Sequence, residues 1–294
     1  MDKSGSPLNA LYDFKVRPDF NPSKNSSFYV EYFWNLEKAP KPDLAYLVSL
    51  ITPLTQASFS KFDADAIINL FFYNKKVSEL NLALFRNINT HKIEGYYTYT
   101  VCIEYFLPNN FTKENEYNVV SGFTMIDKSI RNKGIYHVIG DFYNYPYLIK
   151  NIGKNIVFLD IAINPVSYNL LSKISILYPS YYRQVPRLTQ DFIFTLMQKY
   201  EYTRISEDKP FVVKDVTLVD VNLESWRKSY YRLSKNMQFF IDQTELKPGR
   251  GLLFVAFGNL LQGNTLGLPY TQYCLAKKLP DLLFKEFSFD RPKL

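Results

Sequence analysis

The sequence predicts a mixed α/β (α+β) fold in which a mixed β-sheet is flanked by helices. Stretches with alternating or continuous apolar residues, typical of strands, are interleaved with stretches whose apolar residues recur at the helical period. Of the 294 residues, 47% are hydrophobic and 21% are charged, a globular composition that excludes wholesale disorder. A chain of this length can bury a substantial core without disulfides or metals, as one large domain or two small ones.

The first half of the chain predicts two helices between groups of strands. Asp43 is a suitable N-cap for a helix whose apolar face holds Leu44, Leu47 and Leu50. After position 78 leucines alternate with other residues, which is the pattern of a half-buried strand. In chain order we expect a strand over 27–36, a helix from Asp43, a helix over 60–71, strands over 78–85 and 96–106, a polar loop over 108–116, and a strand over 119–126.

In the second half, the segment 156–163 is nearly all apolar, which is typical of a strand covered on both faces. Asn164 is placed to N-cap a helix that begins at Pro165. Further along we expect a helix over 188–200, a strand over 210–219, a hairpin of strands 237–246 and 252–261 around the turn 247–251, and a helix over 270–287. The predicted division is a flexible arm (1–24), a core (25–180) and a C-terminal portion (181–294) that completes the sheet and adds helices.

Charge and residue usage narrow the classes of function. The net charge of +7 permits a polyanionic partner, but the basic residues are scattered along the chain, so nucleic acid is not expected as a partner. Two cysteines and two histidines stand in no metal-ligand or nucleophile motif, so no metal is expected. The chain begins without a signal-peptide pattern, and no apolar run is long enough to span a bilayer. We expect a cytoplasmic protein and leave delivery into a host cell open.

The clearest functional pattern is an apolar strand, a loop over 127–134 and a following helix. Such a loop can present backbone N–H groups at a helix N-terminus, where the helix dipole favours an anion. Gly134 lets the backbone approach a phosphate closely, and Arg131 and Lys133 add positive charge. The pattern predicts a pyrophosphate-binding loop.

This loop resembles the acyl-CoA-binding motif of the GNAT superfamily of N-acyltransferases, with Arg131, Gly134 and Tyr136 at the motif positions. Tyr136 is bulky where that family has a small residue. The next strand runs into Asn164 and a helix, as in the family, and the resemblance covers about residues 28–178. It implies acetyl-CoA or another acyl-CoA as co-substrate and an amine, in a small molecule or a protein, as acceptor. The residues that it places on the acyl-CoA are Phe123, Thr124, Met125, Arg131, Asn132, Lys133, Gly134, Ile135, Tyr136 and Asn164.

The resemblance also implies catalytic candidates. Many family members have a tyrosine seven residues after the asparagine as general acid; here that position is Leu171, and Tyr168 is the substitute one helical turn beyond Asn164. Glu104 and Asp160, each on a predicted strand, are candidates for the general base. The oxyanion donor would be a backbone N–H around residues 123–125.

Two other functions fit the sequence. A catalytically inactive protein with the same fold would bind CoA or a partner, and Leu171 in place of the tyrosine favours it. A basic interaction protein of a virus or an intracellular bacterium would use the positive charge on a nucleic acid or a host protein.

Overall fold

The computed structural model describes residues 28–58, 77–106, 115–131, 135, 139, 144–174, 176–214 and 223–258. The chain forms two compact units. Unit 1 comprises Met1–Glu104, Asn118–Ile139 and Thr217–Asp220, and unit 2 comprises Tyr105–Tyr117, Gly140–Val216 and Val221–Leu294. Two of the boundaries between the units fall inside strands, at residues 104–105 and 117–118. The boundaries near residues 24 and 180 that the sequence predicts stay predictions.

Unit 1 contains strands in the order β1-β2-β3-β4. Their bounds are Phe28–Phe33 (β1), Val77–Asn87 (β2), Ile93–Phe106 (β3) and Asn115–Ile126 (β4). The pairs β1/β2 and β2/β3 are antiparallel. All four strands were predicted from the sequence, and the mixed α/β class is confirmed.

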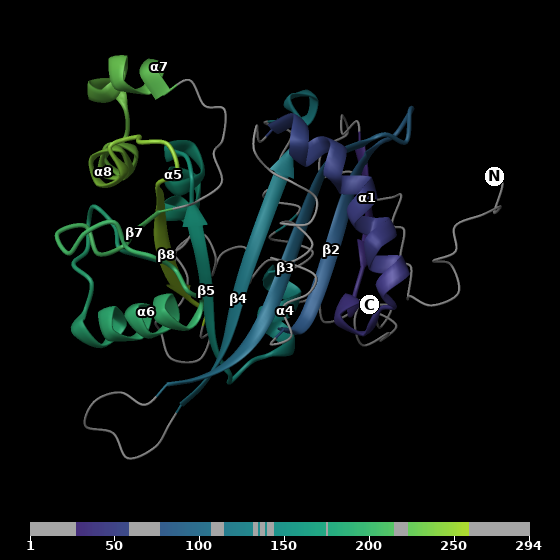
Figure 1. Ribbon diagram of the computed structural model, residues 1–294, viewed down its shortest axis with the longest axis horizontal. Coiled ribbons are helices and arrows are strands. Elements are labelled where there is room, and N and C mark those ends of the chain that lie inside the picture. The colour runs from purple at the N-terminus through teal and green to yellow at the C-terminus, as the bar shows by residue number, and fades with distance from the viewer. Residues whose placement is uncertain are drawn as a thin grey trace, which may run out of the picture. The chain divides into compact units, whose positions relative to one another are not determined.

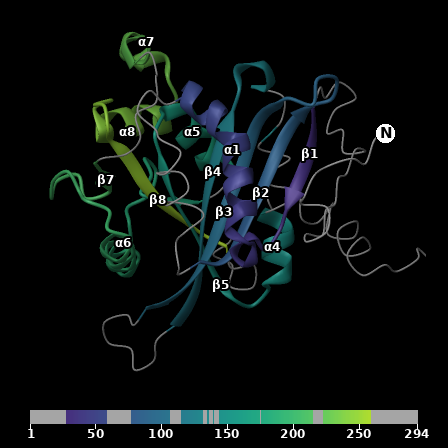
Figure 2. The same cartoon turned by 45° about the vertical axis from the view of Figure 1, so that its right-hand side comes forward.

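Helix α1 (Lys41–Ser58) lies along the strands of unit 1 in both views of the ribbon (Figures 1 and 2). Its buried residues Leu44, Leu47, Val48 and Ile51 recur at helical spacing, which is why this segment forms an amphipathic helix. Near its end the buried Thr55 hydroxyl lies 2.8 Å from the hydroxyl of Tyr96 on β3. The helix predicted from Asp43 is therefore present and packs on the sheet.

The prediction that β2 is half-buried was wrong for the second half of the strand. Residues 80–85 are all buried, including Asn81 and Ala83, which the alternation had placed on an open face. Asn81 is tolerated in the core because its Oδ1 accepts a hydrogen bond from the Asn35 backbone N–H at 3.1 Å. Asn35 precedes the 3₁₀ turn η2 (Leu36–Lys38), whose Glu37 accepts from the Leu80 N–H.

Gly95 on β3 is packed so closely against neighbouring atoms that a side chain at this position would clash with them. A Cβ at this position would lie 2.9 Å from the Met125 carbonyl oxygen and 3.0 Å from the Phe85 ring. We expect Gly95→Ala to lower the free energy of unfolding by about 1–3 kcal/mol, because backbone and ring must shift. Denaturant titration measures this, with Ser121→Ala on β4 as the control. Equal stability of the two variants would contradict the close approach.

Unit 2 is organised around strand β8 (Gly251–Phe257), which is buried along nearly its whole length. It pairs antiparallel with β5 (Asn155–Ala162) and with the two-residue strands β6 (Leu177–Tyr178) and β7 (Val212–Val213). The predicted strand over 210–219 is thus much shorter within the described residues. The helices of this unit are α4 (Tyr145–Lys150), α5 (Pro165–Ile174), α6 (Arg187–Lys199), α7 (Leu223–Lys228) and α8 (Lys235–Thr244).

The predicted hairpin around residues 247–251 was wrong in its first arm, because 237–246 is mostly helix α8. Phe240, Ile241 and Thr244 are buried at spacings of one and three residues, which is one face of a helix. The Ser234 hydroxyl caps the helix by accepting from the Met237 N–H at 3.3 Å. The cap and the helical period outweigh the β propensity of the two phenylalanines.

Several predicted elements lie outside the described residues. These are the arm (1–24), the helix over 60–71, most of the loop over 108–116 and the helix over 270–287.

Candidate functional site

The candidate residues fall into both units. In unit 1, Phe123, Thr124 and Met125 stand near the end of β4, the first two half-buried and Met125 buried. The ring of Phe123 lies 5.9 Å from that of Tyr96. The chain leaves β4 at Asp127, whose N–H donates to the Glu94 carbonyl at 2.7 Å. This bond fixes where the loop begins.

The loop starts with the 3₁₀ turn η4 (Lys128–Ile130). The Asp127 carboxylate accepts from the Ser129 N–H at 2.8 Å, and the hydrogen bonds from Ser129 lower its pKa. Ile130 is fully buried and anchors the turn, while Arg131 is exposed and its Nε donates to the Ile126 carbonyl at 3.4 Å. The N-terminus of this turn is therefore occupied by a carboxylate, and an anion would have to bind further along the loop.

The rest of the predicted loop is mostly outside the described residues, namely Asn132, Lys133, Gly134 and Tyr136. Ile135 is described: it is helical and buried. The helix predicted after the loop and phosphate binding by the loop both stay predictions.

Glu104, the candidate base in unit 1, is 3% exposed. It lies near the end of β3, in a strand buried along most of its length. A buried carboxylate requires compensating polar contacts. The Glu104 side chain therefore has its contacts inside the fold and does not face open solvent.

Asp160, the candidate base in unit 2, is half-buried on β5 opposite Phe254 of β8. Burial raises its pKa to about 7, and a hydrogen bond from the Ile161 N–H at 2.8 Å acts in the opposite direction. The raised pKa follows from the apolar strands around it, because removing a carboxylate from water disfavours its charged form. A carboxyl group that titrates near neutral pH suits general acid–base chemistry.

Asn164 is the N-cap of α5, as predicted. Its Oδ1 accepts from the Ser167 N–H at 2.8 Å, and the helix begins at Pro165. Within the described part of the chain its Nδ2 makes no hydrogen bond, so this amide retains a donor group for a ligand. The cap and the ligand role are compatible, because they use different atoms.

Tyr168, the candidate general acid, is fully buried in unit 2. Its hydroxyl donates to the Pro179 carbonyl at 2.7 Å, and its ring contacts those of Phe239, Phe240 and Phe254. Burial raises its pKa. Delivery of a proton to a leaving thiolate would require this bond to break and the ring to leave the core.

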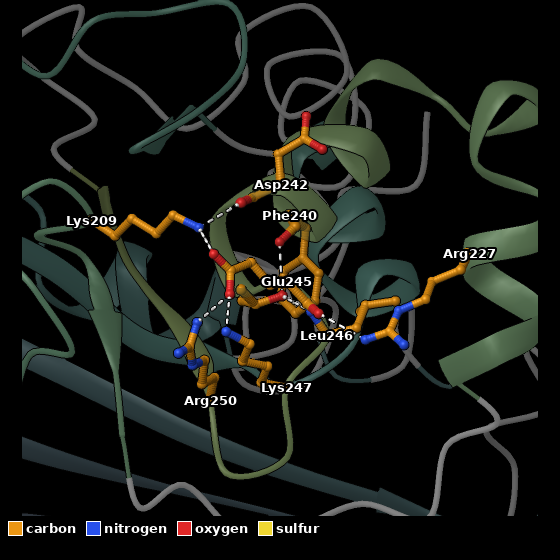
Figure 3. A network of polar contacts seen from close by, with 9 residues as sticks. Lys209, Arg227, Phe240, Asp242, Glu245, Leu246, Lys247 and Arg250 are labelled. Atoms are coloured by element: carbon orange, nitrogen blue, oxygen red, sulfur yellow. Dashed lines mark hydrogen bonds and ion pairs between the residues drawn. The ribbon is translucent and has the colours of Figure 1, made fainter.

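A polar cluster around Glu245 was not among the predicted site residues. The Glu245 carboxylate binds Lys209 from a distant segment and Lys247 and Arg250 from the turn after α8, with N–O distances of 2.5, 2.6 and 2.9 Å (Figure 3). Hydrogen bonds from Lys209 and Lys247 lower its pKa to about 2. Glu245 ends α8 with a left-handed backbone (φ 56°). No local pattern marks it, since Lys209 is distant in sequence.

A shallow depression of about 530 Å³ opens beside this cluster. It is lined by Lys209, Arg227, Tyr230, Tyr231, Ile241, Asp242 and Glu245.

Within the described residues, no group of three or more histidine, cysteine, aspartate or glutamate side chains could hold a metal ion. Among the helices that are described, none has the length and apolar character needed to cross a membrane.

Comparison with known proteins gives a remote structural likeness. No protein-family model matches the sequence, and a search of curated proteins finds no match. Among solved structures, an acetyltransferase of the GNAT family from Streptococcus pneumoniae is 12% identical over 78% of this chain and 99% of its own, with a TM-score of 0.30. A GCN5-related N-acetyltransferase from Kribbella flavida is 10% identical over 79% and 98%, with a TM-score of 0.29.

The NatC complex bound to Gag peptide and CoA is also among the matches, at 12% identity over 49% of this chain and 81% of that chain, with a TM-score of 0.30. The Streptococcus pneumoniae and Kribbella flavida structures are acetyltransferases. Because every TM-score is below 0.5, the likeness carries no argument about ligands or catalysis in this chain.

Proposed function

We propose that the protein is an acyl-CoA-dependent N-acyltransferase that uses acetyl-CoA and an amine of a small molecule or a protein. The observation that carries the proposal is the position of Asp160 on β5, the strand that leads into the helix capped by Asn164. Its raised pKa, about 7, suits a group that must accept a proton from an ammonium at neutral pH. Asp160 precedes Asn164 on the strand–helix unit that resembles the family. Asp160 and Asn164 both lie in unit 2.

In the proposed reaction, the amine nitrogen attacks the thioester carbonyl carbon, the carbon–sulfur bond breaks, and CoA leaves as a thiolate that takes up the second proton lost by the nitrogen. Asp160 takes the proton that the ammonium must lose, and Glu104 is the alternative base. Arg131 and Lys128 are exposed cations after β4, which fits a phosphate-bearing ligand, and Asn132, Lys133, Gly134, Ile135 and Tyr136 complete the proposed phosphate contacts. Backbone N–H groups of Phe123, Thr124 and Met125 would donate to the oxyanion, and the Asn164 Nδ2 to the acyl-CoA.

Acetyl-CoA should raise the melting temperature of the protein, because a ligand that binds the folded state adds to its stability. At a hundredfold excess over the dissociation constant the gain is about 2.7 kcal/mol. We expect Gly134→Val to abolish the shift and Arg131→Ala to reduce it, with Lys154→Ala, an exposed lysine of unit 2, as the control. Differential scanning fluorimetry provides the measurement. If neither acetyl-CoA nor longer acyl-CoAs shift the wild-type transition, the proposal is wrong.

Binding of acyl-CoA without transfer is the second candidate, and the contacts of Tyr168 favour it. A tyrosine whose hydroxyl is committed to Pro179 inside the core does not supply the proton for a leaving thiolate. Assays of CoA release on a panel of amines separate the two functions. Release that depends on an added amine supports the transferase, and a thermal shift without release supports the binding protein.

A further inference from the structure

Unit 2 contains the same four residues twice, Ser-Tyr-Tyr-Arg at 180–183 and at 229–232. Both copies contain the same backbone hydrogen bond. In the first, the Arg183 N–H donates to the Ser180 carbonyl at 3.4 Å, and in the second the Arg232 N–H donates to the Ser229 carbonyl at 2.9 Å. The first turn is closed by an antiparallel bridge between Ser180 and Arg183, and the second includes the 3₁₀ turn η6 (Tyr230–Arg232). Each copy therefore forms a turn that ends at its arginine.

The two tyrosines of each copy have the same ring arrangement. The rings of Tyr181 and Tyr182 are perpendicular, at 88° with centroids 5.0 Å apart. Those of Tyr230 and Tyr231 are perpendicular at 90° and 5.4 Å apart. In a perpendicular pair, one ring cannot cover both faces of the other, so each turn keeps aromatic faces open to a ligand.

Core and polar contacts of α5 bring the two turns together. The Tyr168 hydroxyl holds the Pro179 carbonyl, just before the first turn. On the same helix, Asn169 accepts from the Ser234 hydroxyl at 2.6 Å, just after the second turn. Lys235 then places its Nζ 5.8 Å from the centre of the Tyr181 ring. Helices α5 and α8 also lie side by side in both views (Figures 1 and 2).

A polar contact to α8 holds the second turn. The Tyr230 hydroxyl lies 2.8 Å from each carboxylate oxygen of Asp242, and these hydrogen bonds raise the pKa of Tyr230.

We name these residues, Tyr181, Tyr182, Arg183, Tyr230, Tyr231, Arg232 and Lys235, the paired-tyrosine surface. Tyr181, Tyr182 and Tyr231 are 48%, 69% and 93% exposed, which is unusual for large aromatic side chains. The three cationic residues are exposed. None of the ion pairs within the described residues uses Arg183 or Arg232.

Two carboxylates lie near this surface. Glu245 is neutralised by Lys209, Lys247 and Arg250. Asp242 accepts from the neutral Tyr230 hydroxyl and keeps its negative charge, so it offsets one of the three cations of the surface. The exposed Arg227 lines the adjoining depression and donates to the Glu245 carbonyl at 3.1 Å, which adds a further cation.

We propose that the paired-tyrosine surface binds single-stranded nucleic acid, with bases stacked on the exposed rings and phosphates on Arg183, Arg232 and Lys235. Open aromatic faces beside exposed cations are the combination that non-specific single-strand binding uses. An acidic peptide would engage the cations but would leave the rings without a matching partner. A duplex keeps its bases stacked on one another, so it offers only the phosphates. The proposal does not rest on the acyltransferase function.

Fluorescence anisotropy with a short fluorescein-labelled oligo(dT) or oligo(rU), at low salt, tests it with the full-length protein. We expect the double variant Tyr182→Ala/Tyr231→Ala to weaken binding at least about tenfold, since each stacked base contributes substantially to affinity. Tyr182→Phe/Tyr231→Phe should retain binding, because phenylalanine preserves the stacking face. Tyr46→Ala, a tyrosine of α1 that is 41% exposed, is the matched control and should have no effect.

Arg183→Ala/Arg232→Ala should weaken binding and reduce its salt dependence. The slope of the logarithm of the binding constant against the logarithm of the salt concentration should fall by about 0.7 for each phosphate that is no longer neutralised.

Absence of oligonucleotide binding at low salt would overturn the proposal, as would a loss of affinity in the Tyr46→Ala variant as large as in the double tyrosine variant. If poly-glutamate or a duplex of the same length competes as well as the single strand, the surface recognises charge alone and the proposal is wrong. Thermal unfolding of each variant verifies that these exposed substitutions leave the fold intact.

Discussion

Asp160→Asn should make the protein more stable than the wild type at about pH 8, by up to about 4 kcal/mol, and confer no such gain at about pH 4. The folded-state pKa of Asp160 is about 7, well above that of an aspartate in an unfolded chain. Between these two values the folded state holds a proton that the unfolded state has released. Wild-type stability therefore falls as pH rises through this window, and above it the partly desolvated charge opposes folding.

Denaturant titrations across this pH range measure the difference between the two proteins. Asparagine is nearly the same shape and can still accept from the Ile161 N–H, so the comparison isolates the charge. Asp191→Asn, in which a half-buried aspartate of α6 is changed, is the control and should show no comparable gain. Parallel stability curves for the wild type and Asp160→Asn would show that Asp160 titrates normally.

The same variant tests the catalytic proposal. If Asp160 is the base, kcat/KM of the wild type should rise with pH through about 7, because only the carboxylate accepts a proton. Asp160→Asn should lose acyl transfer and keep the thermal shift with acetyl-CoA. A variant that still transfers at the wild-type rate would leave Glu104 as the remaining candidate.

Truncation of Tyr168 is the second change with a large expected effect. Tyr168→Ala should lower the free energy of unfolding by about 3–5 kcal/mol, as for other large aromatic side chains in cores. It removes a fully buried ring that contacts Phe239, Phe240 and Phe254. Tyr168→Phe keeps the ring and loses only the bond to the Pro179 carbonyl, which we expect to lower stability by about 1–3 kcal/mol.

These two variants also separate a structural role from a catalytic one. With a purely structural hydroxyl, Tyr168→Phe should transfer acyl groups at the wild-type rate once folded. Loss of kcat with unchanged KM in this variant would instead identify Tyr168 as the general acid. If the hydrogen bond from Tyr168 to the Pro179 carbonyl positions the turn at 180–183, both variants should weaken oligonucleotide binding. Tyr168→Ala should weaken it more than Tyr168→Phe does.

Local patterns predicted much of the fold. The apolar run at 156–163, the asparagine and the proline after it predicted β5, the Asn164 cap and α5, and all three are present. Each depends on neighbours within a few residues. Helix α8 was missed because its phenylalanines favour a strand, whereas the Ser234 cap and the buried face decide for a helix.

For the candidate site, the sequence predicted which element each residue belongs to, but not its environment. The local pattern placed Asp160 on a strand and Asn164 at the start of a helix. The pKa of Asp160 was not predictable, since it depends on burial by strands that include β8, far along the chain. The inward position of the Tyr168 hydroxyl likewise depends on Pro179 and on α8.

Composition and short-range pattern were sufficient to predict the α/β class, the order of most described elements, the N-cap of α5 and a net charge of +7. The raised pKa of Asp160 and the burial of Tyr168 depend on the packing of segments that are distant in sequence. Folding also brings the two distant Ser-Tyr-Tyr-Arg turns close to one another. Desolvation and contact between distant segments arise only when the chain is packed, so residues that are scattered along the sequence acquire these properties on folding.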